Sequence, residues 1–300
     1  SASVQQVPAQ PLTQRAWRQI VDRLLPLNIR LRITGGEPTL HPEFEDVLAY
    51  IDARGMSFTL FTNGRWTDPQ RTVDFLRSLR YLECLLISVH GAGPPSHEAF
   101  TATPGSLEET LANVRLATDA GLRVTSSTVI THQNHNELPE LFALARSVGI
   151  RRHTLSRYFG PPLPGIEASE AELACAVRSV EKMRNNGYGP RDGVDTVHYG
   201  GPIPRCFTNN SSNGCMAGFA HAAIDCWGNL KPCTHVSVTA GSLLEADFDT
   251  LWHSPAMEAW RAAYLAQCDG CPLAGECRSG CLAQAIWRGQ VKDPLIKLTL

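Results

Sequence analysis

The sequence lacks both a strong excess of charge and a long apolar run. It contains 27 lysine and arginine residues against 29 aspartate and glutamate residues, which gives a formal net charge of −2. A chain so close to neutral offers no general electrostatic attraction for nucleic acid or for a membrane surface. No apolar run approaches the roughly 20 residues of a membrane-spanning helix, and no secretory signal opens the chain. We therefore expect a cytoplasmic protein with neither nucleic acid nor a membrane as its partner.

Cysteine is absent from residues 1–34 but is concentrated near the C-terminus. Six of the ten cysteines form two spaced groups, Cys215-x12-Gly228-x4-Cys233 and Cys268-x2-Cys271-x5-Cys277-x3-Cys281. The chain is too large for a small disulfide-stapled secreted domain, so the close spacing favours metal ligation in a reducing compartment. Thiolates spaced in this way hold either zinc or iron–sulfur clusters, and the spacing alone leaves both possibilities open.

Helix and strand patterns alternate along the first half of the chain. Strands are predicted at 30–34, 57–61, 81–88, 123–130 and 152–157, and helices at about 12–25, 43–54, 68–79, 106–120 and 137–148. Repeated units of this length predict an α/β fold with a parallel sheet, either doubly wound or curled into a barrel. A Pro- and Gly-rich stretch at 160–165 ends this pattern, and a helix at about 167–185 follows. We place the domain change within 160–204.

Three short polar motifs follow successive predicted strands: Gly35-Gly36-Glu37-Pro38, Thr62-Asn63-Gly64 and Ser88-Val89-His90-Gly91. Parallel sheets and barrels build their sites from the loops after the carboxyl ends of strands. Adjacent glycines let the backbone approach a ligand closely, and Glu37 supplies a carboxylate for an ammonium group. Taken singly, each motif could be an ordinary turn, and His90 a hydrogen-bonded loop residue. Their placement at three consecutive strand ends favours a binding site.

With these motifs the chain resembles the radical S-adenosylmethionine (SAM) superfamily, in which ITGGEP, FTNG, ISVHG and TVITHQN would occupy successive strand ends. The cysteine spacing is similar to the SPASM extension of many peptide-modifying members. The resemblance implies a partial (β/α)6 TIM-like barrel, here lacking its first strand, and a small cysteine-rich C-terminal α+β domain. The domain bounds that it suggests are 1–160 for the barrel, 161–204 for a bridging linker and 205–300 for the SPASM domain.

The resemblance implies two kinds of cofactor, S-adenosyl-L-methionine and [4Fe–4S] clusters. In the family the GGE element binds the methionine end of S-adenosylmethionine, which here corresponds to Gly35, Gly36 and Glu37. Ser88 would lie near the ribose, and Asn63 is included among the cofactor-binding residues.

Auxiliary clusters would be bound by the C-terminal cysteines. The first cluster is expected on Cys215, Cys233 and Cys281, with Cys206 as an additional upstream cysteine, and the second on Cys268, Cys271 and Cys277. The family often ends in Asp-Pro-x-Cys, but here Asp293-Pro294-Leu295 is followed by Ile296. The second cluster is therefore left with three cysteines.

One family motif is absent from the 300 residues. The superfamily's reactive cluster is held by a Cys-x3-Cys-x2-Cys loop before the GGE strand, and no such triplet occurs here. We interpret the chain, which begins at Ser1, as truncated just past that loop, and we expect it to be inactive as given, with no catalytic residue of its own. In addition, Thr234 stands where sulfatase-maturing members carry a catalytic Asp, which argues against that activity.

The predicted function of the full-length parent is hydrogen abstraction from a ribosomally made peptide or protein, which modifies or crosslinks it. A flavodoxin- or ferredoxin-like electron donor is the expected redox partner. Two alternatives stay open: a zinc-binding scaffold with structural thiolates, or a radical enzyme acting on a small molecule such as a tetrapyrrole. Cys84, Cys175 and Cys226 are interpreted as packed thiols. Arg157 is expected either to reach cofactor or a substrate carboxylate, or to form a surface ion pair.

Overall fold

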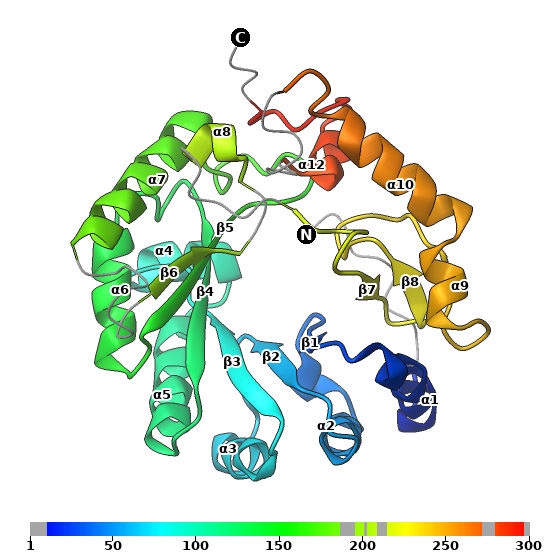
Figure 1. Ribbon diagram of the computed structural model, residues 1–300. Coiled ribbons are helices and arrows are strands. Elements are labelled where there is room, and N and C mark those ends of the chain that lie inside the picture. The colour runs from blue at the N-terminus through cyan, green and yellow to red at the C-terminus, as the bar shows by residue number, and fades with distance from the viewer. Residues whose placement is uncertain (1–10, 187–195, 201–202, 209–214, 272–279, 297–300) are drawn as a thin grey trace. The chain divides into compact units, whose positions relative to one another are not determined.

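The structure is a computed structural model, which describes residues 11–186, 196–200, 203–208, 215–271 and 280–296 (Figure 1). The chain divides into two compact units. The first, here called the sheet unit, comprises Ile29–Tyr158 and Pro164–Gly200. The second, the cysteine-rich unit, comprises Ser1–Asn28, Phe159–Leu163 and Gly201–Leu300. Within the described ranges, every helix is too short or too polar to cross a membrane.

The sheet unit is built on six parallel strands that pair in chain order. They are β1 (Leu31–Ile33), β2 (Phe58–Thr62), β3 (Leu82–Ser88), β4 (Val124–Ile130), β5 (Arg152–Arg157) and β6 (Thr196–Tyr199). Because all strands run the same way, their carboxyl ends meet at one edge, where the GGEP, TNG and SVHG motifs follow β1, β2 and β3. This arrangement confirms the predicted α/β fold with a parallel sheet.

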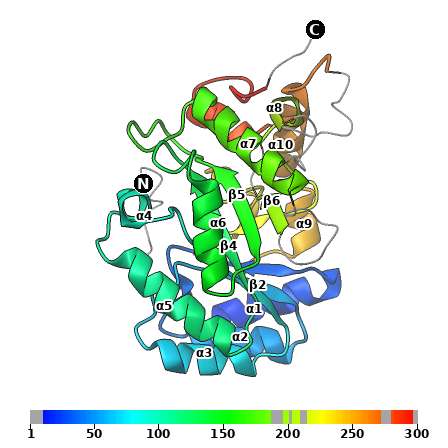
Figure 2. The same cartoon turned by 90° about the vertical axis from the view of Figure 1, so that its left-hand side faces the viewer.

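Helices connect successive strands of the sheet unit. They are α2 (Phe44–Ala53), α3 (Pro69–Ser78), α4 (Pro94–Thr101), α5 (Ser106–Asp119), α6 (Leu138–Ser147) and α7 (Glu170–Asn185). The larger helices α2, α3, α5, α6 and α7 follow the outer side of the curved sheet, and the view in Figure 2 shows α5, α6 and α7 on that same side. Parallel strands joined in order by crossovers of one hand place their helices on one face, as in a partial TIM-like barrel.

Apolar strands and helix caps explain why the sheet unit folds in this way. Phe58 and Leu60 of β2 and Leu85 and Ile87 of β3 are fully buried and lie on one face of the sheet, since residues two apart in a strand point the same way and Leu60 pairs with Leu85. Helix starts are also defined by sequence. In α7, Ser169 and Glu172 form a capping box, with each side chain bonded to the backbone N–H of the other.

Strand β6 was not predicted, and the predicted helix at about 167–185, which is α7, was not expected to belong to the sheet unit. Residues 161–204 were expected to form a linker, whereas α7 and β6 from this range belong to the sheet unit, and β6 pairs with β5. β6 has only four residues in a polar context, so it gives too weak an alternation to identify from sequence. The described sheet therefore has six strands, although five were expected.

The cysteine-rich unit combines short strands and helices. Its antiparallel sheet has the order β7 (Ala223–Ile224), β8 (Asn229–Lys231) and β9 (Gly241–Ser242). Its helices are α1 (Gln14–Leu24), the one-turn η1 (Leu25–Leu27), α8 (Arg205–Thr208), α9 (Phe248–Trp252), α10 (Pro255–Ala266) and α12 (Leu282–Trp287). This confirms a small α+β domain. The expected helix near residues 12–25 is present as α1 with Thr13 as its N-cap, and its Gln19 and Arg23 side chains donate to the carbonyl of Leu244.

Candidate functional site

The carboxylate of Glu37 joins the loop after β1 to the end of β2. Its Oε1 accepts hydrogen bonds from the Thr62 hydroxyl at 2.8 Å and from both the hydroxyl and the backbone N–H of Thr39 at 2.8 and 3.2 Å. Its Oε2 accepts the Asn63 backbone N–H at 2.7 Å. Each carboxylate oxygen has about two acceptor positions, so Oε1 is fully engaged by its three bonds, whereas Oε2 accepts one bond and keeps one position. The structure thus brings Glu37 and Asn63 together, with Glu37 engaged by its own chain.

Thr62 continues this network into the turn after β2. Its hydroxyl donates to Glu37 and accepts from the backbone N–H of Gly64 and the indole N–H of Trp66, both at 3.1 Å. The Asn63 side chain accepts the Arg65 backbone N–H at 2.7 Å, which closes an Asx-type turn. Trp66 is buried. The turn is therefore fixed by side chains of its own residues.

Helix α5 supports the same turn from its buried face. Thr110 donates from its hydroxyl to the Asn63 carbonyl at 3.0 Å, and Asn113 donates from its amide to the Gly64 carbonyl at 2.8 Å. Gly64 has φ +73°, and an added Cβ would lie 3.0 Å from the Ile87 side chain. Sequence reasoning missed Thr110 and Asn113. Their only signal was two polar residues three positions apart on a helix, which becomes informative only once the buried face of α5 is known.

Gly35 and Gly36 face open space in the structure. A Cβ added to either glycine would meet no atom within 4 Å, and neither backbone has the positive φ that favours glycine. The missing side chains therefore leave room beside the backbone rather than permit a special conformation. This geometry fits a ligand that approaches the main chain. Ser88 ends β3, half-buried and paired in register with Ser127 of β4.

His90, in the loop after β3, is a buried structural residue. Its ring Nδ1 accepts the Val129 backbone N–H at 3.2 Å, and its own backbone N–H donates to His97 at 3.1 Å. Its ring also lies 4.4 Å from that of Phe100. Burial lowers the pKa of His90 to about 3, with a smaller contribution from His97, so the ring is neutral at physiological pH. These contacts support the interpretation of His90 as a hydrogen-bonded loop residue.

Two buried polar residues stand at the ends of β4 and β5. Asn134 is fully buried, donates to the carbonyls of His90 and Val129 at 2.8 and 2.7 Å, and accepts the Thr131 backbone N–H at 2.8 Å. It thus ties the loop after β3 to the loop after β4. Arg157 at the end of β5 is only 6% exposed, so the surface ion pair considered for it is wrong.

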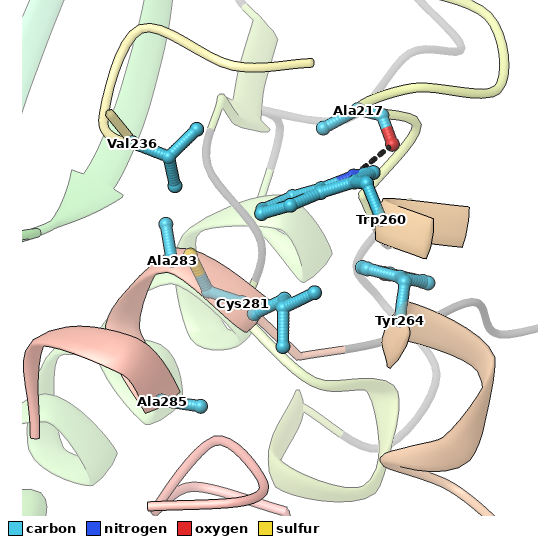
Figure 3. Close-up of a cluster of buried hydrophobic side chains, with 8 residues drawn as sticks. Ala217, Val236, Trp260, Tyr264, Cys281, Ala283 and Ala285 are labelled. Atoms are coloured by element: carbon cyan, nitrogen blue, oxygen red, sulfur yellow. Dashed lines mark hydrogen bonds between the residues drawn. The ribbon is translucent and has the colours of Figure 1, made fainter. Parts of the chain in front are cut away.

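Three cysteines of the predicted first auxiliary site lie in or against one apolar cluster of the cysteine-rich unit, which Figure 3 draws with Cys281 among its members. Cys281 is part of the buried cluster and Cys215 and Cys233 pack against it. Each sulfur accepts a backbone N–H, from Ala217 to Cys215 at 3.5 Å, from His235 to Cys233 at 3.4 Å and from Gln284 to Cys281 at 3.3 Å. Such N–H···S contacts orient cluster-ligating sulfurs and tune their electronics.

The cysteines share a cluster without already forming a ligand shell. Within the described residues, no group of three or more His, Cys, Asp or Glu side chains has a geometry that could hold a metal ion, and the described cysteines are free thiols. Burial raises the pKa of Cys215 to about 11 and also raises that of Cys233. Both are therefore protonated without metal, and ligation would displace their protons. Thiols that already accept N–H groups fit a thiolate-bound cluster.

The remaining predicted metal ligands are placed differently. Cys206 lies beside Leu295, with 4.0 Å between its sulfur and the Leu295 carbonyl oxygen. Cys268 is buried just after α10, and its carbonyl accepts the Cys271 backbone N–H at 2.9 Å. Cys277 lies outside the described residues. Of the second predicted ligand set, the structure therefore describes Cys268 and Cys271.

The Asp-Pro segment near the C-terminus secures Cys281. Asp293 is 1% exposed, and its carboxylate accepts the backbone N–H groups of Cys281 at 2.6 Å and Leu295 at 3.0 Å. Ile296 packs so closely on Gly280 that an added Cβ there would lie 2.7 Å from it. Where the resembling family often carries a last cysteine, this chain therefore places a buried apolar side chain. Asp293 was noted only as part of a motif, and its role could not be read from the sequence.

Comparisons with known proteins identify two domains in the chain. The profile of the radical SAM superfamily matches residues 2–145, and that of SPASM, an iron–sulfur cluster-binding domain, matches residues 215–272. The chain is 25% identical over 278 residues to the AdoMet-dependent heme synthase of Methanosarcina barkeri, covering 84% of this chain and 76% of that protein. It is 26% identical over 293 residues to the mycofactocin maturase MftC of Mycobacterium tuberculosis, covering 94% and 73%. It is 25% identical over 287 residues to the PqqA peptide cyclase of Xanthomonas campestris, covering 90% and 73%.

Solved structures show the same fold. Streptococcus suis SuiB has a TM-score of 0.77 at 17% identity, over 97% of this chain and 72% of that one. AnSMEcpe with bound AdoMet has a TM-score of 0.73 at 13% identity, over 91% and 80%. The SPASM match makes iron–sulfur rather than zinc the chemistry of the cysteine-rich unit. The chain belongs to the radical SAM superfamily, whose cofactors are S-adenosylmethionine and [4Fe–4S] clusters, and carries a SPASM auxiliary-cluster domain.

Proposed function

We propose that this protein acts as a radical SAM enzyme on a ribosomally made peptide or protein, from which it abstracts hydrogen in order to modify or crosslink it. The observation that carries the proposal is the pairing of a braced GGE loop with a SPASM cysteine cluster in one chain. Relatives named as a peptide cyclase and a mycofactocin maturase support the peptide substrate. A cytoplasmic location and a flavodoxin- or ferredoxin-like electron donor are parts of this proposal.

Each residue of the strand-end site has an assigned task in this proposal. Gly35, Gly36 and Glu37 would bind the methionine end of S-adenosylmethionine, the two glycines through their backbone, beside which the structure leaves space. Ser88 and Asn63 would face the remainder of the cofactor, and Glu37 would keep the loops after β1 and β2 in register. S-adenosylmethionine bound next to a reduced cluster supplies the hydrogen-abstracting radical. The protein holds this cofactor against the target and excludes water.

The auxiliary ligands form a second assignment. Cys215, Cys233 and Cys281 would hold the first auxiliary cluster, with Cys206 as the further candidate. The second cluster would use Cys268, Cys271 and Cys277. Such clusters pass electrons or bind substrate, and nearby hydrogen bonds tune their potentials.

A second candidate function keeps the radical chemistry but acts on a tetrapyrrole. It is supported by the similarity to AdoMet-dependent heme synthases of Methanosarcina barkeri and Nitratidesulfovibrio vulgaris, at 25% and 23% identity. The strand-end site would be the same in both cases, because it serves the cofactor rather than the substrate.

One experiment separates the two candidates. The full-length gene is co-expressed with each short open reading frame beside it, and the peptides are analysed by mass spectrometry. Loss of two hydrogens from one peptide, dependent on the enzyme, is the expected result. In parallel, the purified enzyme is incubated with an iron tetrapyrrole that carries propionate groups, S-adenosylmethionine and dithionite. Loss of carboxyl groups from that tetrapyrrole, with every peptide unchanged, would replace the peptide proposal by the second candidate.

A further inference from the structure

A cavity of about 500 Å³ lies at the amino ends of β4 and β5, at the edge of the sheet opposite the GGEP, TNG and SVHG motifs. It is formed by the turn that leads from α5 into β4 and the turn that leads from α6 into β5. Its volume falls within the range of about 300–1,000 Å³ that is typical of small-molecule sites. All of its lining residues belong to the sheet unit, and they are separate from both sites described above.

Arginine dominates the lining of this cavity. The charged residues of the lining are four arginines and one aspartate, namely Arg115, Arg123, Arg151, Arg152 and Asp119. The lining therefore carries an excess of three positive charges, in a chain whose formal net charge is −2. All four arginines are exposed, so a dissolved anion can reach them.

The four guanidinium groups form no ion pair within the described part of the chain, and Asp119 forms none with them. By contrast, Arg65 and Arg71 elsewhere in the sheet unit each pair with a glutamate. Arginine is attracted to the C-terminal end of a helix, but Arg115 is the only one of the four that lies in a helix. The cluster therefore holds like charges close together, and a bound anion would relieve their repulsion.

The two turns are fixed to each other, so the cavity is formed before any ligand binds. The Thr118 hydroxyl at the end of α5 donates to the Val148 carbonyl of the second turn at 2.9 Å. Gly149 has φ +88°, and an added Cβ would lie 2.9 Å from the Thr118 side chain, so glycine permits this close approach. Gly121, in the first turn, faces open space. A site formed in advance loses less conformational entropy on binding.

We propose that this cavity binds a small molecule that carries two or more phosphate groups. The planar guanidinium group of arginine pairs with phosphate oxygens through two parallel N–H···O bonds. Two phosphate groups, at about −1.5 to −2 charges each near pH 7, match the excess of three positive charges. Val124 and Val148 add apolar surface to the lining, which suits the uncharged body of such a ligand. A lone carboxylate would leave most of the arginines unpaired.

The test measures binding of inorganic diphosphate to the iron-reconstituted 300-residue chain by isothermal titration calorimetry. Binding is expected at low salt and should weaken at physiological salt, because exposed charges are then screened beyond about 8 Å. The double variant Arg115→Gln, Arg152→Gln should bind roughly tenfold or more weakly, since it loses charge-assisted hydrogen bonds. Asp119→Asn, which removes the acidic side chain of the lining, should bind more tightly than the wild type. A gain of affinity cannot arise from misfolding.

The matched control is Arg77→Gln, which removes an exposed arginine from the last turn of α3, outside the cavity. It should bind diphosphate as the wild type does. If it loses as much affinity as the double variant, diphosphate responds to net charge alone and the proposal is wrong. Wild-type affinity in the double variant would place diphosphate elsewhere, for example on the iron, and would also overturn it. So would a wild-type protein that does not bind diphosphate, or one that binds a hexaglutamate peptide more tightly.

Discussion

The strand-end site and the cysteine site are organised by opposite kinds of interaction. At the strand ends, charged and polar side chains satisfy one another, with four hydrogen bonds on the Glu37 carboxylate and three on the Thr62 hydroxyl. Around Cys215, Cys233 and Cys281 the neighbours are apolar, and the sulfurs accept long backbone contacts of 3.3–3.5 Å. The polar side chains of the first site thus find most of their partners within the chain, whereas the second site has buried thiols whose best partners are metal ions.

This difference decides what each site loses on mutation. Removing one group from the strand-end network leaves its buried or half-buried partners without a hydrogen bond, so binding of S-adenosylmethionine is weakened but not abolished. Removing a thiol from the cysteine site removes a covalent ligand, so the cluster is lost outright. The predictions below proceed from complete loss to partial loss.

The largest expected effect is a complete lack of cofactor cleavage by the 300-residue chain. With dithionite and S-adenosylmethionine it should form no 5′-deoxyadenosine, even when the auxiliary site is filled, because no Cys-x3-Cys-x2-Cys triplet is present. The Cys268-x2-Cys271-x5-Cys277 spacing differs from that of the triplet. Chromatography of the nucleoside products measures this. A chain extended by such a triplet loop is the positive control, and turnover by the unextended chain would show that the catalytic centre has been misplaced.

Loss of iron is the next largest effect. Replacing Cys215 or Cys233 by Ala should remove most of the iron, from about four irons per chain if the first auxiliary site alone is filled. Iron and acid-labile sulfide analysis of reconstituted protein measures this. Cys84→Ala is the matched control, because Cys84 is a half-buried thiol of β3 and should leave the iron content unchanged. A colourless wild-type protein with one equivalent of zinc would contradict the iron–sulfur assignment.

The sequence predicted the outline of both sites because their signals are local. Apolar runs give the strands from β1 to β5, and fixed spacing gives the cysteine groups. β6 was missed, since four residues with alternating burial carry too little pattern. Helix α1 was predicted from its apolar spacing, but nothing local reveals that its Gln19 and Arg23 reach the carbonyl of Leu244. Long-range pairing of this kind depends on the tertiary fold.

Roles of individual side chains were harder to predict than positions. That Glu37 receives an ammonium group stays a prediction, and the sequence did not show that its carboxylate also accepts hydrogen bonds from Thr62 and Asn63 of the next strand end. The orientation of a carboxylate follows from donors that lie 25 residues away in the sequence. For the same reason, no local pattern showed that Asp293 holds the backbone of Cys281.

A moderate effect is expected when the Glu37 network is broken. In a chain extended by the triplet loop, Glu37→Ala should bind S-adenosylmethionine roughly tenfold or more weakly, because a charge-assisted hydrogen bond contributes about 1.5–3 kcal/mol. Glu37 could act by holding the loop in place or by contacting the ammonium group directly, and Thr62→Val separates these two explanations. If Glu37 holds the loop through Thr62, Thr62→Val also weakens binding of S-adenosylmethionine. If Glu37 contacts the ammonium group directly, Thr62→Val leaves that binding unchanged. Thr59→Val on the same strand is the control, and equilibrium dialysis measures the affinity.

The smallest expected effect is acid sensitivity of the sheet unit. His153 of β5 is buried, bonded to the Ser126 hydroxyl at 2.8 Å and stacked on Phe142 at 4.1 Å. Burial lowers the pKa of His153 to about 4, against about 6.5 in an unfolded chain. The unfolded state therefore binds the proton first as pH falls, so stability decreases below about pH 6.5 and levels off below about pH 4.

Between pH 7 and 5.5, His153 should account for about 1 kcal/mol of the stability that the sheet unit loses. Hydrogen exchange of the β4 and β5 amides at both pH values measures the sheet unit by itself. A His153→Gln variant should show a correspondingly smaller loss, because its side chain does not titrate in this range. His253, which is largely exposed in the cysteine-rich unit, provides the control: His253→Gln should lose as much as the wild type. Equal losses in the wild type and His153→Gln would mean that the acid sensitivity has another origin.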